Sequence, residues 1–445
     1  MALPLAQLPT FGPPLGSFQA LLTTMGAFAL ILLLARLKVP LAAAVLAGAA
    51  AEGLLLGGSP ADLARVAGLG AVRPETLGLA VVTALLLALS GTMRRGGQME
   101  RIVAAARALL RRPSLTMVAL PALIGLLPMP GGALFSAPMV EAAAGEHGKN
   151  RAKLSAVNYW FRHIWEHWWP LYPGVLVALT YATSYPSFAA HQIPLGLFMA
   201  GAGLLLFRGT GKAMHAAAPP EPGARRRLLG AAAPVWLILA VTVPAMVAFR
   251  LAPMDAIGPA GGAMAKFAPI ALGVAASLAW TTRRSGLSAA DVRSVWLSRR
   301  LIEMVLLVIS VMVFRQVLSG VGADGRIAEE LTALHVPLVL VVMLLPFIAG
   351  LVTGLAIGFA GTSFPIVLPM AEAAHGPAAV PAFLALAYAF GHLGQMVSPL
   401  HVCHVMSNKY FRTGFGGVYR QMLPSMLLLA GLSVAYFYAL RALGI

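Results

Sequence analysis

The stretch AVNYWFRHIWEHWWPLYPG, residues 156–174, decides the fold of this chain. It combines aromatic side chains with Arg162, His163, Glu166 and His167, and apolar runs on both sides place it inside a membrane. Ionisable groups inside a bilayer are costly and usually face a protein interior or an aqueous cavity, so they mark functional sites. The stretch therefore predicts a polar functional centre within a membrane protein.

The composition of the whole chain is that of an all-α polytopic membrane protein. Of its 445 residues, 59% are hydrophobic and 11% are charged, and the mean hydropathy of +0.83 is well above that of soluble domains. The formal charge of +17 comes from basic residues in loops between apolar runs. Membrane topology explains that charge, and no nucleic-acid partner is expected. From the single cysteine, Cys403, we expect no internal disulfide and no cysteine-based metal or iron–sulfur site, and we interpret both as excluded.

Apolar runs divide the chain into segments of about 20 residues, the length that spans a bilayer. The predicted segments are 18–36, 39–57, 76–93, 115–145, 155–184, 192–207, 229–250, 260–282, 301–321, 337–374, 379–406 and 421–440. Two of them are interrupted by small and helix-breaking residues, LPMPGGALFSAP at 127–138 and GFAGTSFPIVLP at 358–369. We interpret both as re-entrant hairpins, because irregular backbone at membrane depth needs surrounding protein or water.

The placement of basic residues predicts the orientation of the chain. With the N-terminus outside and both hairpins returning to the side they entered, 24 of the 32 Lys and Arg residues lie on the inside. Cytoplasmic loops carry such an excess of positive charge. The sequence therefore predicts ten crossings with both termini outside.

Sequence repetition points to a duplication. FRHIWEHWWPLY (161–172) aligns with FGHLGQMVSPLH (390–401) at an offset of 229, and APMVEAAAG (137–145) aligns with LPMAEAAHG (368–376) at an offset of 231. A third pair, around Arg101 and Arg326, falls on opposite sides of the predicted membrane. We therefore expect two inverted-topology repeats, each with about five spanning helices and one hairpin, a design typical of secondary transporters.

The predicted domain boundaries follow from this repeat. The first repeat is 1–207, with its hairpin at about 115–145 and a broken helix at about 155–184. The second is 229–445, and its hairpin and broken helix lie at about 337–374 and 379–406. The Pro-, Gly- and Arg-rich segment 208–228 between them is interpreted as a cytoplasmic linker.

Hairpin tips and helix breaks supply the candidate substrate site. Half-helix N-termini attract anions, and unwound carbonyls suit cations. The alternative is that the small residues merely permit close helix packing. The proposed substrate-binding residues are Gly131, Gly132 and Ser136, Gly361, Thr362 and Ser363, and Pro170, Tyr172, Ser398, Pro399 and His401 around the two breaks.

Glu166 is the candidate for proton coupling, because a carboxylate in a medium of low dielectric constant is readily protonated. Its repeat mate is Gln395, which cannot titrate. Against this role, Arg162 precedes Glu166 by four residues and would hold it ionised in a structural pair. His163 and His392 also align, as a proton relay or as hydrogen-bonded packing groups. The sequence alone leaves these alternatives open.

Other polar and aromatic residues are interpreted as structural or left open. Glu141 and Glu372 are expected to be solvated groups at the surface ends of the hairpins. The tryptophans near Glu166 form either an interfacial belt or a chamber wall. The chain has no HExxH, nucleophile-elbow or P-loop motif. We therefore expect no enzyme activity, no metal site and no cofactor, apart from sodium as one choice of coupling ion.

The hairpins and broken helices resemble those of the ion transporter superfamily, which includes dicarboxylate, gluconate and arsenite transporters. PMPGGALFSAP, NYWFRHIWEHWWPLYPG and GHLGQMVSPLHVC are more closely similar to a prokaryotic membrane family, domain-of-unknown-function family 401. This resemblance implies a location in the cytoplasmic (inner) membrane of a bacterium or archaeon. The superfamily resemblance implies an elevator-type transporter, usually a homodimer, with a scaffold region and a mobile transport region. The dicarboxylate branch carries Ser-Asn-Thr at each hairpin tip, which this chain lacks, so dicarboxylate specificity and sodium coupling do not carry over.

The expected function is secondary active transport of a small organic anion, coupled to protons or sodium, with membrane lipids around the protein. A cation/proton antiporter centred on Glu166 is the first alternative. An intramembrane enzyme or lipid-handling protein that uses the Trp-rich segment is the second.

Overall fold

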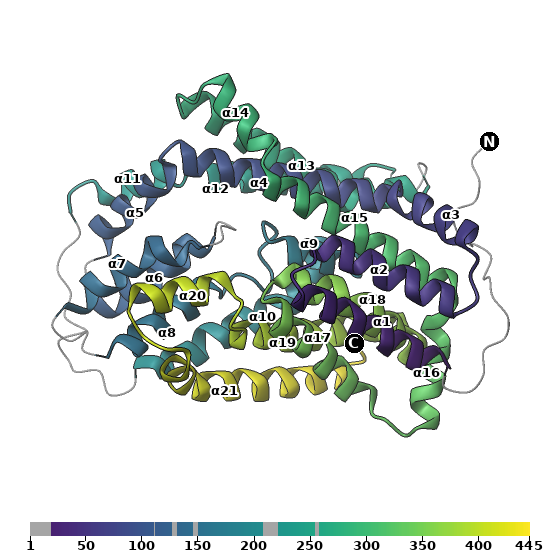
Figure 1. The fold of residues 1–445 in the computed structure, drawn as a ribbon. Helices are drawn as coiled ribbons and strands as arrows, with labels where there is room; N and C mark the ends of the chain where they lie inside the picture. Colours follow the sequence, from purple (N-terminus) through teal and green to yellow (C-terminus); the bar gives the residue numbers. More distant parts are fainter. Residues whose placement is uncertain (1–18, 111, 127–130, 146–149, 208–220, 254–257) are drawn as a thin grey trace.

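The computed structural model describes residues 19–110, 112–126, 131–145, 150–207, 221–253 and 258–445, and all statements below concern these ranges. Within them the chain is helical and contains no strand, as predicted (Figure 1). Nine helices are long and apolar enough to cross a bilayer, and a tenth is counted if the bent pair α16–α17 is one span. The protein is therefore a multi-pass membrane protein.

The first ten helices precede residue 204. They are α1 (Gln19–Arg36), α2 (Leu41–Leu55), α3 (Pro60–Ala71), α4 (Pro74–Arg95), α5 (Gln98–Leu109), α6 (Pro113–Gly125), α7 (Ala133–Ala144), α8 (Arg151–Arg162), α9 (Pro173–Leu179) and α10 (Tyr185–Gly203). The segment predicted to span at 39–57 forms α2, whose 15 residues are short for a complete crossing.

The remaining helices begin after the predicted linker. They are α11 (Ala224–Ala231), α12 (Ala233–Leu251), α13 (Pro259–Arg284), α14 (Ala289–Trp296), α15 (Arg299–Gly320), α16 (Ala323–Ala333), α17 (Leu338–Thr353), α18 (Ala356–His375), α19 (Val380–Val397), α20 (Val402–Tyr410) and α21 (Phe415–Ala442). Several of them begin at a nearly constant spacing from helices of the first half. Both α4 and α15 have 22 residues, and α8 and α9 begin 229 residues before α19 and α20.

Two groups of helices build the molecule. The long helices α4, α12, α13 and α15 lie along one side, where α13 packs against α4 and α12 (Figure 1). The hairpins and broken helices, α6–α10 and α17–α21, pack together on the other side. We call these groups the long-helix layer and the hairpin layer. The α19–α20 segment is the most enclosed of the apolar spans, because 83% of its apolar 18-residue stretch is buried.

The two hairpins are antiparallel helix pairs. In the first, α6 packs against α7, and Gly131 and Gly132 precede α7, while the rest of the predicted tip, 127–130, lies outside the described residues. In the second, α17 packs against α18 and the turn lies at Gly354, whose φ of +64° is a left-handed conformation that favours glycine.

The tip predicted at 358–369 is wrong, because Gly361, Thr362 and Ser363 lie within the continuous helix α18. The Thr362 hydroxyl donates to the Gly358 carbonyl at 2.8 Å, and the Ser363 hydroxyl donates to the Phe359 carbonyl at 2.7 Å. Hydroxyls that bond back one turn are satisfied inside a helix and do not require a break. Gly361 instead allows close packing against Val311 of α15.

Candidate functional site

Two breaks in the hairpin layer organise the buried polar centre. The first break separates α8, which ends at Arg162, from α9, which begins at Pro173. The second separates α19 from α20 and covers residues 398–401. Pro170 and Pro399 lie within these breaks. Proline has no amide hydrogen and clashes with the carbonyl of the preceding turn. The second helix breaks at the predicted residues, whereas the first break already begins after Arg162, well before Pro170, and is longer than the prolines alone predict.

Glu166 lies in the first break and is 4% exposed. Its Oε2 accepts a hydrogen bond of 2.8 Å from Nε2 of Gln395, the residue predicted to be its repeat mate. His163 Nε2 lies 3.7 Å from Oε1, and His392 Nδ1 lies 3.7 Å from Oε2. Three of the residues proposed for ion coupling, from both halves of the chain, therefore surround the Glu166 carboxylate.

Two buried tyrosines connect the breaks in a reciprocal way. The Tyr388 hydroxyl donates to the backbone carbonyl of Glu166 at 2.7 Å. The Tyr159 hydroxyl lies 3.5 Å from the carbonyl of Gln395 and 3.3 Å from that of Met396. Tyr159 and Tyr388 are 229 residues apart, as are Glu166 and Gln395. Each tyrosine thus contacts a backbone carbonyl of the other half of the chain, Tyr388 within the first break and Tyr159 in the last turn of α19, just before the second break. Sequence reasoning missed both tyrosines, although the 229-residue offset pairs them.

Arg162 places a positive charge at the first hairpin. Its side chain is buried, and its guanidinium lies against Gly132, where an added Cβ would be 2.8 Å from Nε. Gly132 immediately precedes α7, so the guanidinium lies beside the N-terminus of that helix. Helix N-termini carry partial positive charge and free amide hydrogens. Arg162 and α7 together form a site suited to an anionic group.

Asn158 and Ser155 link α8 to both α7 and α20. The Asn158 amide nitrogen donates to the Ala133 carbonyl at 3.1 Å and to the Ser407 hydroxyl at 3.0 Å. The Ser155 hydroxyl donates to Oδ1 of Asn408 at 2.7 Å. These polar contacts hold the start of α7 against α8 and α20. Sequence reasoning missed them, because none of these residues belongs to a recognisable motif.

Histidines form the second part of the centre. His163 Nδ1 lies 2.6 Å from the Tyr159 carbonyl, and its Nε2 lies 3.1 Å from Nε2 of His401. The ring of His167 lies 4.4 Å from that of His392, centroid to centroid. Among the described residues, neither ring nitrogen of His167 or His392 has a hydrogen-bond partner. The sequence proposed His163, His392 and His401, and it did not single out His167.

The tryptophans of the first break act as structural contacts. The indole nitrogens of Trp165 and Trp169 donate to the carbonyls of Ala122 and Leu126 at 2.7 and 2.9 Å. These bonds fasten the break to the end of α6. Tyr172 contributes to the same junction, since its hydroxyl donates to the Gly125 carbonyl. Trp160 and Trp169 are buried, and Trp165 and Trp168 are half-buried.

Other predicted site residues have local partners. The Ser136 hydroxyl lies 3.4 Å from the Ala133 carbonyl, and the Ser398 hydroxyl accepts from the Leu400 amide at 3.2 Å. Glu141 pairs with Arg151 and accepts from the Tyr410 hydroxyl at 2.7 Å, as expected for a group at the surface end of a hairpin.

The fold and this centre define a class: a multi-pass helical membrane protein whose buried polar groups meet between two broken helices. The chain belongs to the family described as "Protein of unknown function (DUF401)", whose model matches residues 31–219 and 271–439. The resemblance to family 401 is confirmed, and membership of the wider superfamily stays a prediction. No curated protein matches the sequence.

One solved structure that the chain is similar to is the crystal structure of the Alcanivorax borkumensis YdaH transporter, described as having an unusual topology. The sequence identity is 17% and the TM-score is 0.49, and the similarity covers 82% of this chain and 84% of that chain.

Proposed function

We propose that this protein is a secondary active transporter of a small organic anion in the cytoplasmic membrane. The observation that carries the proposal is the buried Arg162 guanidinium beside Gly132 at the start of α7. A guanidinium forms strong, charge-assisted hydrogen bonds with a carboxylate, and a helix N-terminus favours negative charge. A carboxylate substrate bound at this position would pair with the guanidinium beside the positive end of the α7 dipole.

The proposed architecture is a pair of inverted repeats. Packing between the halves is reciprocal: α7 contacts α20 while α18 contacts α9, and α4 contacts α13 while α15 contacts α2. The aligned residues Glu166 and Gln395 bond to each other, as residues near a twofold axis do. These pairings support a duplicated fold of the kind in which transporters alternate access about a central site.

We further propose an elevator-type movement of the hairpin layer against the long-helix layer. The helices α5 and α16 connect these layers, following α4 and α15 respectively. Each begins after a glycine in the left-handed conformation, Gly97 with φ +66° and Gly322 with φ +65°. Such positions absorb backbone rotation with little steric cost. A homodimer belongs to the same proposal and rests on the superfamily resemblance.

The protein reconstituted into proteoliposomes tests the proposal directly. Uptake of radiolabelled mono- and dicarboxylates is measured under an imposed proton or sodium gradient, with empty liposomes as the control. We expect gradient-dependent accumulation and counterflow of at least one carboxylate. Failure of every carboxylate in the panel, with the protein correctly folded and inserted, would falsify the anion proposal.

A second candidate function is cation/proton antiport centred on Glu166. The observation that favours it is that His163, His392 and Gln395 surround the Glu166 carboxylate. This function needs no anionic substrate. This function predicts that cations, and not carboxylates, collapse a proton gradient in the same liposomes. It also predicts that Glu166→Gln abolishes exchange, and an active variant would rule it out.

A further inference from the structure

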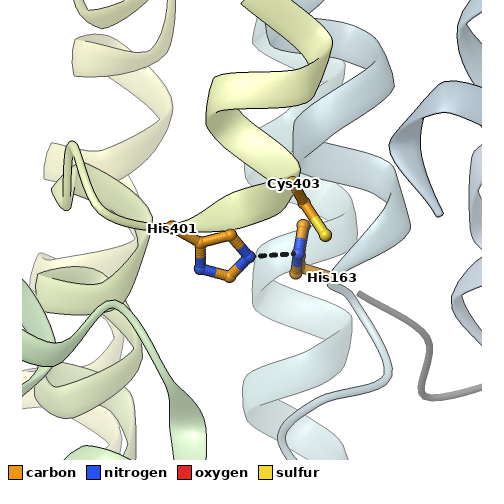
Figure 2. Close-up of side chains that lie close together, drawn as sticks. All are labelled: His163, His401 and Cys403. Carbon is orange, nitrogen blue, oxygen red and sulfur yellow. Dashed lines mark hydrogen bonds between the residues drawn. The ribbon is translucent and has the colours of Figure 1, made fainter. Parts of the chain in front are cut away.

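A second kind of site is formed where the two breaks meet. Figure 2 shows that the side chains of His163, His401 and Cys403 lie close together, although they come from different segments of the chain. All three residues are buried. Each can offer one ligand atom, a ring nitrogen from His163 and His401 and the thiol sulfur from Cys403, and these atoms lie within 4.8 Å of one another. His163 opens the first break, while His401 closes the second and Cys403 follows it in α20. Imidazole and thiolate are the donors that zinc and similar metals prefer.

The hydrogen bonds prepare His163 for metal binding. Its Nδ1 faces the Tyr159 carbonyl at 2.6 Å and therefore carries the proton, which leaves the lone pair on Nε2 directed at His401. A ligating histidine usually donates its other N–H to a carbonyl or carboxylate in this way. Among the described residues, His401 Nδ1 has no hydrogen-bond partner, so that ring is free to carry its proton there and release Nε2 as a ligand.

We propose that His163, His401 and Cys403 bind one divalent transition-metal ion of the zinc class, bridging the two broken helices. In a tetrahedral site with ordinary Zn–N and Zn–S bonds, ligand atoms lie about 3.3–3.8 Å apart. The two imidazole nitrogens are 3.1 Å apart, and the remaining ligand separations stay within 4.8 Å. Small side-chain rotations therefore complete the geometry.

Metal binding changes the charge of this centre. Binding removes the proton from the Cys403 thiol, since the thiolate is the ligand, and releases it to solvent. The thiolate and the Glu166 carboxylate, whose Oε1 lies 3.7 Å from His163 Nε2, offset the two positive charges of the metal, and the guanidinium of Arg162 leaves one positive charge in excess. Three protein ligands leave one coordination position for water or a carboxylate.

The sequence could not predict this site. Its ligands lie on two segments separated by 238 residues, His163 on one and His401 with Cys403 on the other. The spacing of the two ligands on the second segment, H-x-C, is weak evidence by itself. Only the approach of the two breaks joins them. The proposal does not depend on anion transport, and its test needs no transport measurement.

The test uses the full-length protein, purified without a histidine tag and stripped by a chelator. We expect it to bind one Zn²⁺ per chain, counted by elemental mass spectrometry. Replacement by Co²⁺ should give the intense thiolate-to-cobalt charge-transfer band in the near ultraviolet. Because Cys403 is the only cysteine, that band reports this site alone. A wild-type protein that binds no stoichiometric metal, or binds cobalt without the band, overturns the proposal.

Two variants and one matched control complete the test. Cys403→Ser should remove the charge-transfer band, and His401→Gln should weaken Zn²⁺ affinity by at least about tenfold, because a ligand is lost. His404→Gln should change neither, since His404 is a buried neighbour of Cys403 that stacks on Tyr159 outside the cluster. Equal metal binding by all four proteins would contradict the assignment. If a variant misfolds, the wild-type cobalt spectrum still decides.

Discussion

The two helix breaks differ in length and chemistry although they occupy equivalent places. The first extends over residues 163–172 and carries Glu166, and the second covers only 398–401. A tyrosine contacts the backbone at or beside each break, because Tyr388 bonds the Glu166 carbonyl in the first break while Tyr159 contacts the Gln395 carbonyl in the last turn of α19, before the second break. The comparison teaches that aligned residues, such as the two tyrosines, support the backbone in both halves. Residues found in one break only, such as Glu166, are the candidates for substrate binding and ion coupling.

Arg162 and its equivalent, Gly391, show this difference most clearly. In the first half the Arg162 guanidinium lies against Gly132 before α7. In the second half Gly391 has no side chain, and the ring of Phe359 from α18 fills the space where a Cβ would point. A charged contact in one half is thus an apolar contact in the other. We therefore place the proposed anion site in the first half alone.

The largest expected effect comes from removing this charge. Arg162→Gln should lower carboxylate uptake by at least about 100-fold, because truncating one partner of a buried charge pair typically costs 2–5 kcal/mol. Initial rates of uptake in proteoliposomes measure the effect. Arg315→Gln is the matched control. Arg315 is another arginine within a predicted span, but it belongs to α15 of the long-helix layer, and its guanidinium lies over the ring of Tyr181. Equal losses in both variants would argue against a specific anion site at Arg162.

The next prediction exchanges two aligned residues that bond to each other, Glu166 in the first break and Gln395 in α19. Glu166→Gln should make uptake independent of the proton gradient. The double exchange Glu166→Gln with Gln395→Glu moves the carboxylate across a hydrogen bond of 2.8 Å and should restore at least a tenth of the gradient dependence. Uptake with and without an imposed pH gradient measures both.

Two results would contradict this assignment of proton coupling. Full gradient dependence in the Glu166→Gln single variant would place the coupling group elsewhere. Failure of the double exchange in a folded protein would show that coupling needs the particular surroundings of position 166, not merely a carboxylate between His163 and His392. Thermal unfolding of each variant establishes that the fold is retained.

The sequence predicted those structural features that follow from a local steric rule better than those whose residues have more than one structural role. Prolines break a helix by a local steric rule, so the breaks at Pro170 and Pro399 were predictable. The second hairpin tip was misplaced because Gly, Thr and Ser also serve helix packing. Thr362 and Ser363 satisfy their hydroxyls within α18, and the chain turns at Gly354 instead.

The contacts between distant segments were not predictable from one sequence. The 229-residue offset aligns Glu166 with Gln395, but it does not reveal that these two residues touch. The approach of His163 to His401 joins residues that are not repeat mates. Such contacts depend on the angle at which two broken helices cross, and no local propensity encodes that angle.

A smaller effect is expected at the glycine that faces Arg162. Gly132→Ala should raise the KM for the carboxylate about tenfold and change the maximal rate little, because the added methyl group displaces the flexible guanidinium from the start of α7. Gly201→Ala in α10 is the control, since its added Cβ meets nothing within 4 Å. Concentration-dependent uptake gives both constants. An unchanged KM for Gly132→Ala would argue against substrate binding at this helix terminus.

The smallest effects test the reciprocal tyrosines. Tyr388→Phe removes a buried hydrogen bond of 2.7 Å and leaves the Glu166 carbonyl unsatisfied, so it should lower the free energy of unfolding by about 1–2 kcal/mol. Tyr159→Phe removes longer contacts of 3.3 and 3.5 Å and should cost less than half as much. Thermal unfolding in detergent compares the two. If Tyr159→Phe lowered the free energy of unfolding more than Tyr388→Phe, the expected order would be wrong. The contacts of Tyr159 with α19 would then stabilise the protein more than the bond from Tyr388 to the Glu166 carbonyl.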